Sequence, residues 1–393
     1  MDIPLLKRLY TLLSESLDAI YIIILGTVIF YRFALAAYLG GYIFDEVYYV
    51  NAARDLLSGV GTNHEHPPLV KLIIAAAIYI FGDRPLSWRI PSFIAYIASL
   101  YLVFYILYRL NRNFIYSLSI MLILALDLHY FNLMSIAMLD PICIALSLST
   151  LYLLIERRNI VYPSILYGLA LLSKLQAIIL VIPYILITYL WYSTDRRLIR
   201  KLADILIFLA ISAGIFLIFL DIYDVIYTQF SSFVDHLKYM FSYHSALTYE
   251  NESEIIPVYK WISTICYEPI PYYIVSMDSR ILIRVVGIAT PLSISIIPIA
   301  ILTTFTGFRY RDKIGLSCIL GSMLYLLFYL YLEYMQHRYV YPFYIIYILP
   351  LIIIGLNSTT MLNPRYFKIL ITILLITQAI VFLIYLPNPL FQV

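Results

Sequence analysis

Clusters of ionisable residues stand beside apolar segments in this chain and are the first candidates for chemistry. Asp45 and Glu46 in "YIFDEVYY" follow the first long apolar run, and "NHEHPPLVK" places His66 and Lys71 shortly after them. A carboxylate at a membrane surface can act as a general base, and a lysine in the first turn of a helix can bind an anion together with the helix N-terminus. Solvation of the acids and snorkelling of Lys71 towards the lipid headgroups are the alternative interpretations.

Further motifs carry charged residues at the ends of apolar runs. They are Arg89 in "WRIPS", Asp140 in "SIAMLDP", Lys174 in "LLSKLQ", and His337 with Arg338 in "HRYVYPFY". Each basic residue alone is compatible with a snorkelling anchor, whereas snorkelling does not explain the acids. Acids and cations gathered on one side of a membrane are typical of a site for a charged ligand, and arginine binds phosphate bidentately.

The sequence contains only weak signals for a metal site. His64, Glu65 and His66 supply part of a possible ligand set, and His64 and Glu65 are the candidates that we retain. The 3 cysteines lie far apart and form neither a disulfide framework nor a zinc motif. A divalent ion is compatible with the chemistry considered below but is not required by it, so no cofactor is predicted.

Composition places these residues in a membrane protein. The chain is 63% hydrophobic and 12% charged, whereas soluble domains carry about 25% charged residues. Long uncharged runs recur, and helices satisfy their own backbone hydrogen bonds in lipid, so we predict an all-α polytopic membrane protein. The basic residues are scattered at the ends of the runs, which excludes a nucleic-acid-binding patch.

Eleven membrane-spanning helices are predicted from the apolar runs. They cover residues 18–40, 88–108, 114–134, 140–155, 160–173, 176–192, 202–220, 281–306, 314–332, 338–356 and 367–386. The run 69–82 is not included, because a helix of this length reaches only about 21 Å, less than the roughly 30 Å of the hydrocarbon core. It is predicted to lie on the membrane surface, as is an amphipathic helix over 47–57.

The distribution of charge supports this topology. With 69–82 at the surface and the N-terminus inside, most of the 26 Lys and Arg residues fall on the N-terminal side of the membrane, as cytoplasmic loops require. Two large outer loops then cover residues 41–87 and 221–280, and the second contains the sequon Asn251-Glu252-Ser253. All the charged motifs above belong to the outer side. We predict one transmembrane domain over residues 1–393.

Taken together, the motifs "FDEVYY", "HPPLVK", "WRIPS", "SIAMLDP", "LLSKLQ" and "HRYVYPFY" resemble those of the dolichyl-phosphate-mannose protein mannosyltransferases in order and spacing. The resemblance covers roughly residues 20–345. That family is a branch of the membrane glycosyltransferases of the C-type fold (GT-C), which also includes bacterial aminoarabinose transferases acting on lipid A. The resemblance implies a GT-C fold with about 11 transmembrane helices and interfacial helices in the first outer loop.

The resemblance also implies roles for individual residues. Asp45 corresponds to the essential acid, Glu46 to its partner and Asp140 to a second acid facing the site. The residues that correspond to contacts with the lipid phosphate or to the loop motif are Arg89, Lys174, Arg338, Lys71 and His66, and the other candidates for loop or acceptor contacts are His64 and His337. Family members often carry Arg five residues before the second acid, where this chain has Ser135.

These residues predict an inverting glycosyltransferase at the outer membrane face. Its donor is a polyprenyl (dolichyl) phosphate-linked sugar held at the lipid bilayer, and its acceptor is a hydroxyl of a protein Ser or Thr, a lipid or a glycan. Asp45 is the expected base, and a base on the face opposite the leaving phosphate predicts inversion. The alternative is a transporter or flippase of the same lipid. Transporters usually place charges near the midplane and contain internal repeats, neither of which is evident here.

Overall fold

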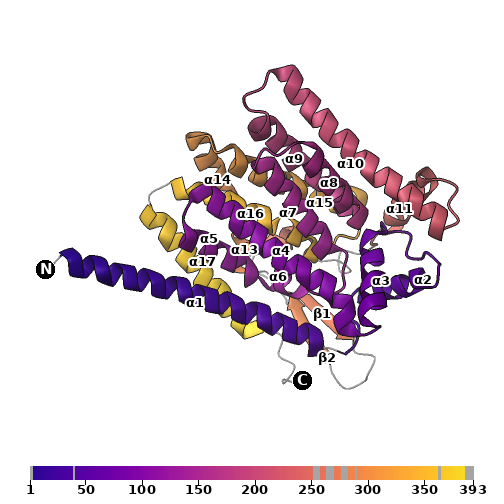
Figure 1. The fold of residues 1–393 in the computed structure, drawn as a ribbon, viewed down its shortest axis with the longest axis horizontal. Helices are drawn as coiled ribbons and strands as arrows, with labels where there is room; N and C mark the ends of the chain where they lie inside the picture. The colour runs from indigo at the N-terminus through magenta and orange to yellow at the C-terminus, as the bar shows by residue number, and fades with distance from the viewer. Residues whose placement is uncertain are drawn as a thin grey trace.

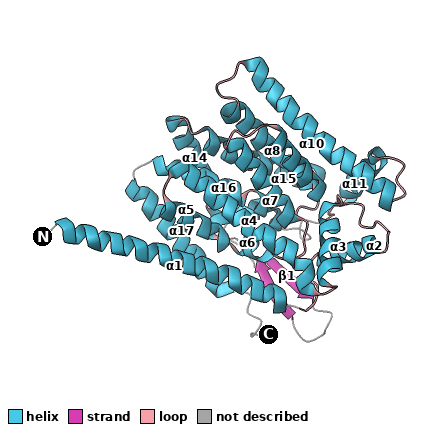
Figure 2. Cartoon of the chain, viewed as in Figure 1, coloured by secondary structure: helices cyan, strands magenta, loops and turns pink. Residues whose placement is uncertain are grey.

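The structure is a computed structural model. It describes residues 3–38, 40–250, 257–262, 270–275, 282–287, 290–361 and 364–385. The predicted sequon at 251–253 and the cysteine at position 266 lie outside these ranges. The described part of the chain is built mainly from helices, with one two-stranded hairpin (Figure 2).

The first half of the chain consists of helices joined by short connections. They are α1 (Ile3–Tyr38), α2 (Glu46–Leu57), α3 (Leu69–Phe81), α4 (Pro85–Asn111), α5 (Phe114–Ala125), α6 (Leu128–Leu133), α7 (Asp140–Ile155), α8 (Val161–Ser173), the 3-10 helix η1 (Leu175–Leu180), α9 (Val181–Ile187) and the π-helical turn η2 (Thr188–Tyr192). Figure 1 shows α2 and α3 together at one end of the bundle.

The second half contains the longest described span and the hairpin. Its elements are α10 (Leu198–Tyr227), α11 (Phe233–Ala246), α12 (Val258–Ile262), β1 (Ile270–Val275), β2 (Leu282–Gly287), α13 (Pro291–Ile294), α14 (Ile296–Tyr310), α15 (Lys313–Gln336), η4 (Pro342–Tyr347), α16 (Leu349–Leu356), η5 (Asn357–Met361) and α17 (Pro364–Tyr385). The strands pair antiparallel, with Ile270 opposite Gly287 and Val275 opposite Leu282.

Seven helical segments are long and apolar enough to cross a membrane, among the described residues. They correspond to the predicted spans 18–40, 88–108, 176–192, 202–220, 314–332, 338–356 and 367–386. The other four predicted spans fall on the shorter apolar helices α5, α7, α8 and α14. The polytopic helical fold is therefore confirmed, whereas the count of eleven spans is not.

Two predicted spans have different boundaries in the structure. The predicted span 114–134 is broken between α5 and α6, because Asp127 caps α6 by accepting a hydrogen bond from Tyr130 N and also binds the Gln378 amide at 3.2 Å. The predicted span 281–306 begins as strand β2, and its helical part starts only at Pro291. Hydrophobicity alone does not distinguish a buried strand from the first turns of a helix.

The core lies where α4, α5, α14 and α15 surround α16. Every residue of α16 is buried, as its uninterrupted apolar sequence "LPLIIIGL" predicts. The peripheral helices α1, α10 and α17 instead expose large apolar side chains, including Phe30, Phe219 and Ile373. Such surfaces suit contact with lipid. Figure 1 shows α1 and α10 on opposite sides of the bundle.

The first outer loop folds as predicted into two helices, α2 and α3, which pack against each other. Pro68 is the N-cap of α3, and Gly82 ends it with a φ of 82° that glycine adopts readily. Helix α11 follows α10 on the same end of the bundle (Figure 1). This end carries the predicted site residues. The placement of α3 at the membrane surface stays a prediction.

Candidate active site

A pocket of about 270 Å³ opens beside the start of α2. Its lining includes Asp45, His66 and Lys174, which come from three motifs singled out in the sequence, together with His244 and Tyr344. Several tyrosine and phenylalanine rings complete the wall. A small cavity with aromatic walls and a few convergent polar groups is typical of a ligand site.

Asp45 is the carboxylate that this pocket presents. It is the N-cap residue of α2, but its side chain caps nothing, and among the described residues its oxygens make no hydrogen bond or ion pair. Burial raises the pKa of Asp45 to about 6, with Lys174 opposing and Asp140 assisting the increase. The preceding residue, Phe44, has a φ of 53°, a strained conformation for a bulky side chain that is often found at functional sites. The carboxylate is therefore available to accept a proton.

Lys174 reaches the pocket from a break between helices. Helix α8 ends at Ser173, and Lys174 takes an extended conformation before η1 begins. Its Nζ lies 2.8 and 2.9 Å from the two carboxylate oxygens of Asp140 and 5.3 Å from the centre of the Phe343 ring. Asp140 stands at the N-terminus of α7 and Lys174 at the C-terminus of α8, so each charge complements its helix dipole. The structure thus places a buried ion pair at one wall of the pocket.

Arg89 is not among the residues that line this pocket. Its predicted contact with the donor phosphate is therefore not seen in this structure. Its Nε and Nη2 atoms donate to the two carboxylate oxygens of Glu46 at 2.8 and 2.7 Å, and both side chains are fully buried. Arg89 also donates to the carbonyls of Ala36 and Gly41. Arg89 is therefore occupied by protein acceptors.

Glu46 is likewise occupied by protein donors in this structure, and its predicted role as a catalytic partner stays a prediction. Besides Arg89, its carboxylate accepts the backbone N–H groups of Ile43 at 2.7 Å and Ala137 at 2.8 Å. These bonds close the turn that ends in Asp45 and fasten it to the segment before α7. Glu46 thus acts on the site by holding the backbone of its neighbour.

Lys71 also serves the loop rather than an anion in this structure. Its buried Nζ donates to the carbonyl oxygens of Thr62 at 3.3 Å, Asn63 at 2.6 Å and His66 at 2.8 Å. Three carbonyls satisfy the three donors of an ammonium group. The prediction that Lys71 binds phosphate is not supported by this geometry.

A pair of histidines also lines the pocket. The rings of His66 and His244 are 5.3 Å apart, and His244 Nε2 lies 3.0 Å from the carbonyl oxygen of Glu65. Burial lowers the pKa of His66 well below its ordinary value, with the charges of Lys174, His244 and Lys71 adding to the effect, and burial also lowers the pKa of His244. Both rings are neutral at pH 7, so they can donate and accept hydrogen bonds. His244 belongs to the predicted outer loop 221–280 but to none of the motifs, so the sequence analysis did not identify it.

The remaining predicted residues, Arg338, His337 and His64, do not line the pocket of Asp45. Arg338 donates to the His244 carbonyl at 3.0 Å and His337 is exposed at the end of α15. His64 faces a second, larger cavity of about 500 Å³ with Phe230, and this cavity contains no acidic or basic side chain other than that imidazole. The convergence of Arg89, Lys174 and Arg338 on a single phosphate is thus not seen: of the three, only Lys174 lines the pocket with Asp45.

The position where family members often carry arginine has an alternative occupant here. Ser135 is contacted by Arg32 of α1, whose guanidinium also donates to the Asn132 carbonyl at 2.8 Å and lies over Phe131. Arg32 is buried, and the sequence analysis did not single it out although it interrupts an apolar run. Arg32 therefore places a cation next to Ser135, although from a different helix.

No group of three or more His, Cys, Asp or Glu side chains is arranged to hold a metal ion within the described ranges. His64 and Glu65, the weak metal candidates, make other contacts: Glu65 accepts from the Asn63 amide, and the His64 ring packs on Phe230. A role for a divalent ion stays untested.

The fold and the family comparison agree on the class of protein. Residues 65–223 match the family model described as dolichyl-phosphate-mannose-protein mannosyltransferase. The crystal structure of ArnT from Cupriavidus metallidurans bound to undecaprenyl phosphate aligns with 90% of this chain and 62% of that chain, at 14% identity and a TM-score of 0.54. The S. cerevisiae Pmt1-Pmt2 complex bound to the sugar donor aligns with 63% of this chain and 36% of that chain, at 16% identity and a TM-score of 0.43. A search of curated proteins finds no match.

These comparisons confirm the resemblance drawn from the motifs. The protein is a polytopic membrane protein with the C-type glycosyltransferase fold, as the likeness to ArnT shows. Over residues 65–223 its sequence matches the model of the protein mannosyltransferase family. The matched segment includes the motifs of His66, Arg89, Asp140 and Lys174, whereas Asp45 lies before it.

Proposed function

We propose that this protein transfers a sugar from a polyprenyl phosphate to a hydroxyl acceptor. The observation that carries the proposal is Asp45, a half-buried carboxylate without a protein partner among the described residues, facing a pocket that also holds Lys174. The family match and the fold support the same reaction class. The ArnT structure is bound to undecaprenyl phosphate, and a lipid phosphate suits a pocket beside membrane helices.

The transfer can be followed atom by atom. The acceptor oxygen attacks the anomeric carbon, the bond from that carbon to the phosphate oxygen breaks, and the acceptor proton passes to the Asp45 carboxylate. The bond electrons leave with the polyprenyl phosphate, which is a good leaving group and needs no general acid. Attack from the face opposite the phosphate inverts the anomeric configuration.

Lys174 is the proposed electrostatic stabiliser of the leaving phosphate. Its ammonium is already held by Asp140 and by two aromatic rings, so it needs no reorganisation as charge develops. The neutral His66 and His244 rings are suited to hydrogen bonds with sugar or acceptor hydroxyls. We propose that the reaction takes place on the extracytoplasmic side. The pocket includes residues of the first outer loop, and the distribution of basic residues predicts a cytoplasmic N-terminus.

A transporter or flippase is the second hypothesis and is less favoured. The acids and Lys174 gather at helix ends, whereas transporter sites usually lie near the midplane of the membrane. Purified protein incubated with polyprenyl-phosphate hexoses and with peptide, lipid and glycan acceptors distinguishes the two. Transfer predicts an acceptor heavier by one sugar and the release of polyprenyl phosphate, detected by mass spectrometry. Movement of intact donor across vesicles without any product would contradict the proposal.

The rate of transfer should depend on pH through Asp45. Because its pKa is raised to about 6, the base form is lost as pH falls through that value. We expect kcat/KM to be level above pH 7 and to fall about tenfold per unit below pH 6, since the phosphodiester donor stays ionised throughout. The profile is measured in detergent between pH 4.5 and 8.5. If kcat/KM fell only near pH 4, where an ordinary aspartate titrates, the Asp45 carboxyl would not be desolvated as described.

A further inference from the structure

Every carbonyl oxygen from residue 62 to residue 66 is bound by a side-chain nitrogen. Lys71 binds those of residues 62, 63 and 66. The two between them are bound from α11: His236 Nε2 lies 2.8 Å from the His64 carbonyl, and His244 Nε2 lies 3.0 Å from the Glu65 carbonyl. An unassisted loop would leave such groups to water. This loop, residues 61–66, is therefore held by three side chains, two of which belong to one helix.

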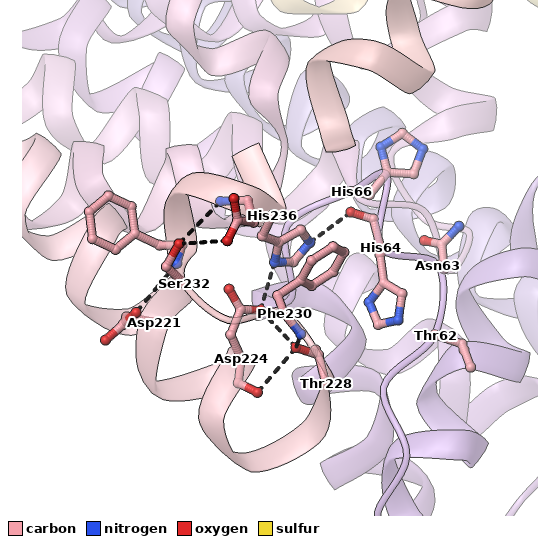
Figure 3. Close-up of polar contacts among 12 residues, drawn as sticks. Thr62, Asn63, His64, His66, Asp221, Asp224, Thr228, Phe230, Ser232 and His236 are labelled. Carbon is pink, nitrogen blue, oxygen red and sulfur yellow. Dashed lines mark hydrogen bonds and ion pairs between the residues drawn. The ribbon is translucent and has the colours of Figure 1, made fainter. Parts of the chain in front are cut away.

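His236 is itself fixed by an acid on the preceding helix. Its Nδ1 lies 2.6 Å from Asp224 Oδ1 at the end of α10, and its ring stacks on Phe230 with centroids 4.4 Å apart (Figure 3). Both His236 and Asp224 are buried. Since Nε2 faces a carbonyl it must carry a proton, and the Asp224 contact needs a second proton between Nδ1 and the carboxylate. The acid thus sets the orientation of the ring that binds the loop.

Helix α11 has the anchors that such a role requires. Ser232 caps its N-terminus by accepting from Asp235 N, and Met240 is fully buried against Leu172 and Leu220. The base of the loop is tied to α10 as well. Gly61 N donates to the Tyr227 carbonyl at 2.8 Å, and a Cβ at Gly61 would stand 2.8 Å from that oxygen, so only glycine allows this approach.

We propose that α11 is a clasp, with His236 and His244 as positioning residues that set the 61–66 loop against the pocket of Asp45. The loop carries Asn63, Glu65 and His66 into the pocket wall. Lys71 and the two histidines of α11 hold the loop backbone, and this sets where these side chains leave it. The consequence for catalysis rests on the proposed function, whereas the mechanical link between α11 and the loop does not.

The link is tested by hydrogen–deuterium exchange of the intact protein in detergent. The readout is the exchange rate of the peptide that covers the loop, where the amides of Gly61 and His66 are hydrogen-bonded. We expect H236L to accelerate this exchange by about tenfold or more. H236Q should stay within about threefold of wild type, since a glutamine amide nitrogen can occupy the place of Nε2 and donate to the same carbonyl. Unchanged exchange in H236L would overturn the clasp.

A control and a second position keep the test informative if one variant misfolds. K238A alters the same helix at an exposed side chain whose ammonium lies 3.5 Å from Asp235, and it should exchange as wild type. H244L, which removes the other histidine bond, should accelerate the same peptide. A general acceleration across α7 and α16 would indicate unfolding of the protein instead and would count against a local clasp.

Transfer assays on the same variants separate the clasp from the function. H236L should lower kcat by about tenfold with the donor KM within about threefold, and H236Q should recover most of the loss, because misplaced groups slow the chemical step. Faster loop exchange with an unchanged kcat would overturn the positioning role. If H236L accelerated loop exchange but the wild-type protein transferred no sugar, the clasp would stand and the proposed function would be refuted.

Discussion

Asp45→Asn is expected to lower the rate of sugar transfer by about 10²–10⁴-fold, the range that a general base contributes. Asparagine has nearly the same shape but does not accept the proton of the acceptor hydroxyl. Since Asp45 makes no hydrogen bond or ion pair with the described residues, the substitution breaks no contact. The loss should therefore appear in kcat, with the affinity for the polyprenyl phosphate largely kept. Single-turnover kinetics with saturating donor would measure it.

The stability of this variant provides an independent check. The folded state raises the pKa of Asp45 above its ordinary value, so the ionised carboxylate costs stability at pH 7 and a neutral side chain removes that cost. Asp45→Asn should therefore melt at the same temperature as wild type or higher. Asp83→Asn, in the same outer loop but paired with Arg54 at the surface, is the matched control and should retain activity. Turnover of Asp45→Asn within about threefold of wild type would remove Asp45 from the role of base.

Arg89→Met is expected to destabilise the protein by about 3–5 kcal/mol, the cost of leaving one partner of a buried ion pair alone. Arg89 and Glu46 have no exposed side-chain area, and the carboxylate would keep only its two backbone donors. The turn that carries Asp45 should loosen as a result, and activity should fall together with stability. Thermal unfolding in detergent, followed by circular dichroism, measures the change.

Two further variants identify the cause of that loss. Combining Arg89→Met with Glu46→Gln removes both charges and should recover part of the stability, since no unpaired charge remains. Arg109→Met, on the same helix α4, breaks the partly exposed pair with Glu156 and should cost only about 0–1 kcal/mol. If Arg89→Met were as stable as wild type but failed to bind the donor, Arg89 would contact the phosphate after all, as the family resemblance implies.

Much of the architecture follows from local properties of the sequence. The apolar runs indicate where helices lie because a chain in lipid must satisfy its backbone within each helix. The Pro-Pro pair before α3 and the Gly at its end mark its boundaries, since both residues have restricted or unusual backbone preferences. The ends of the helices were less predictable: the break at Asp127 and the strand at β2 depend on partners that are distant in the chain.

Some of the site residues could also be predicted from the sequence. The motifs of Asp45, His66 and Lys174 were identified from their charges at the ends of apolar runs, and all three line one pocket. His244 was not identified, because an isolated histidine in an outer loop carries no spacing signal. It lies 179 residues from the Glu65 carbonyl that it binds.

By itself, the sequence determined that this is a polytopic helical membrane protein with acids and cations at one set of helix ends, because hydropathy and charge are properties of each residue and its neighbours. Only the tertiary structure decided which charges are available. Arg89 and Lys71 are basic residues in predicted phosphate motifs, yet Glu46 and three carbonyls occupy them. The Arg89–Glu46 pair joins residues 43 positions apart. A charge in a low-dielectric interior must find its partner wherever the fold brings one, and that pairing is not encoded in local spacing.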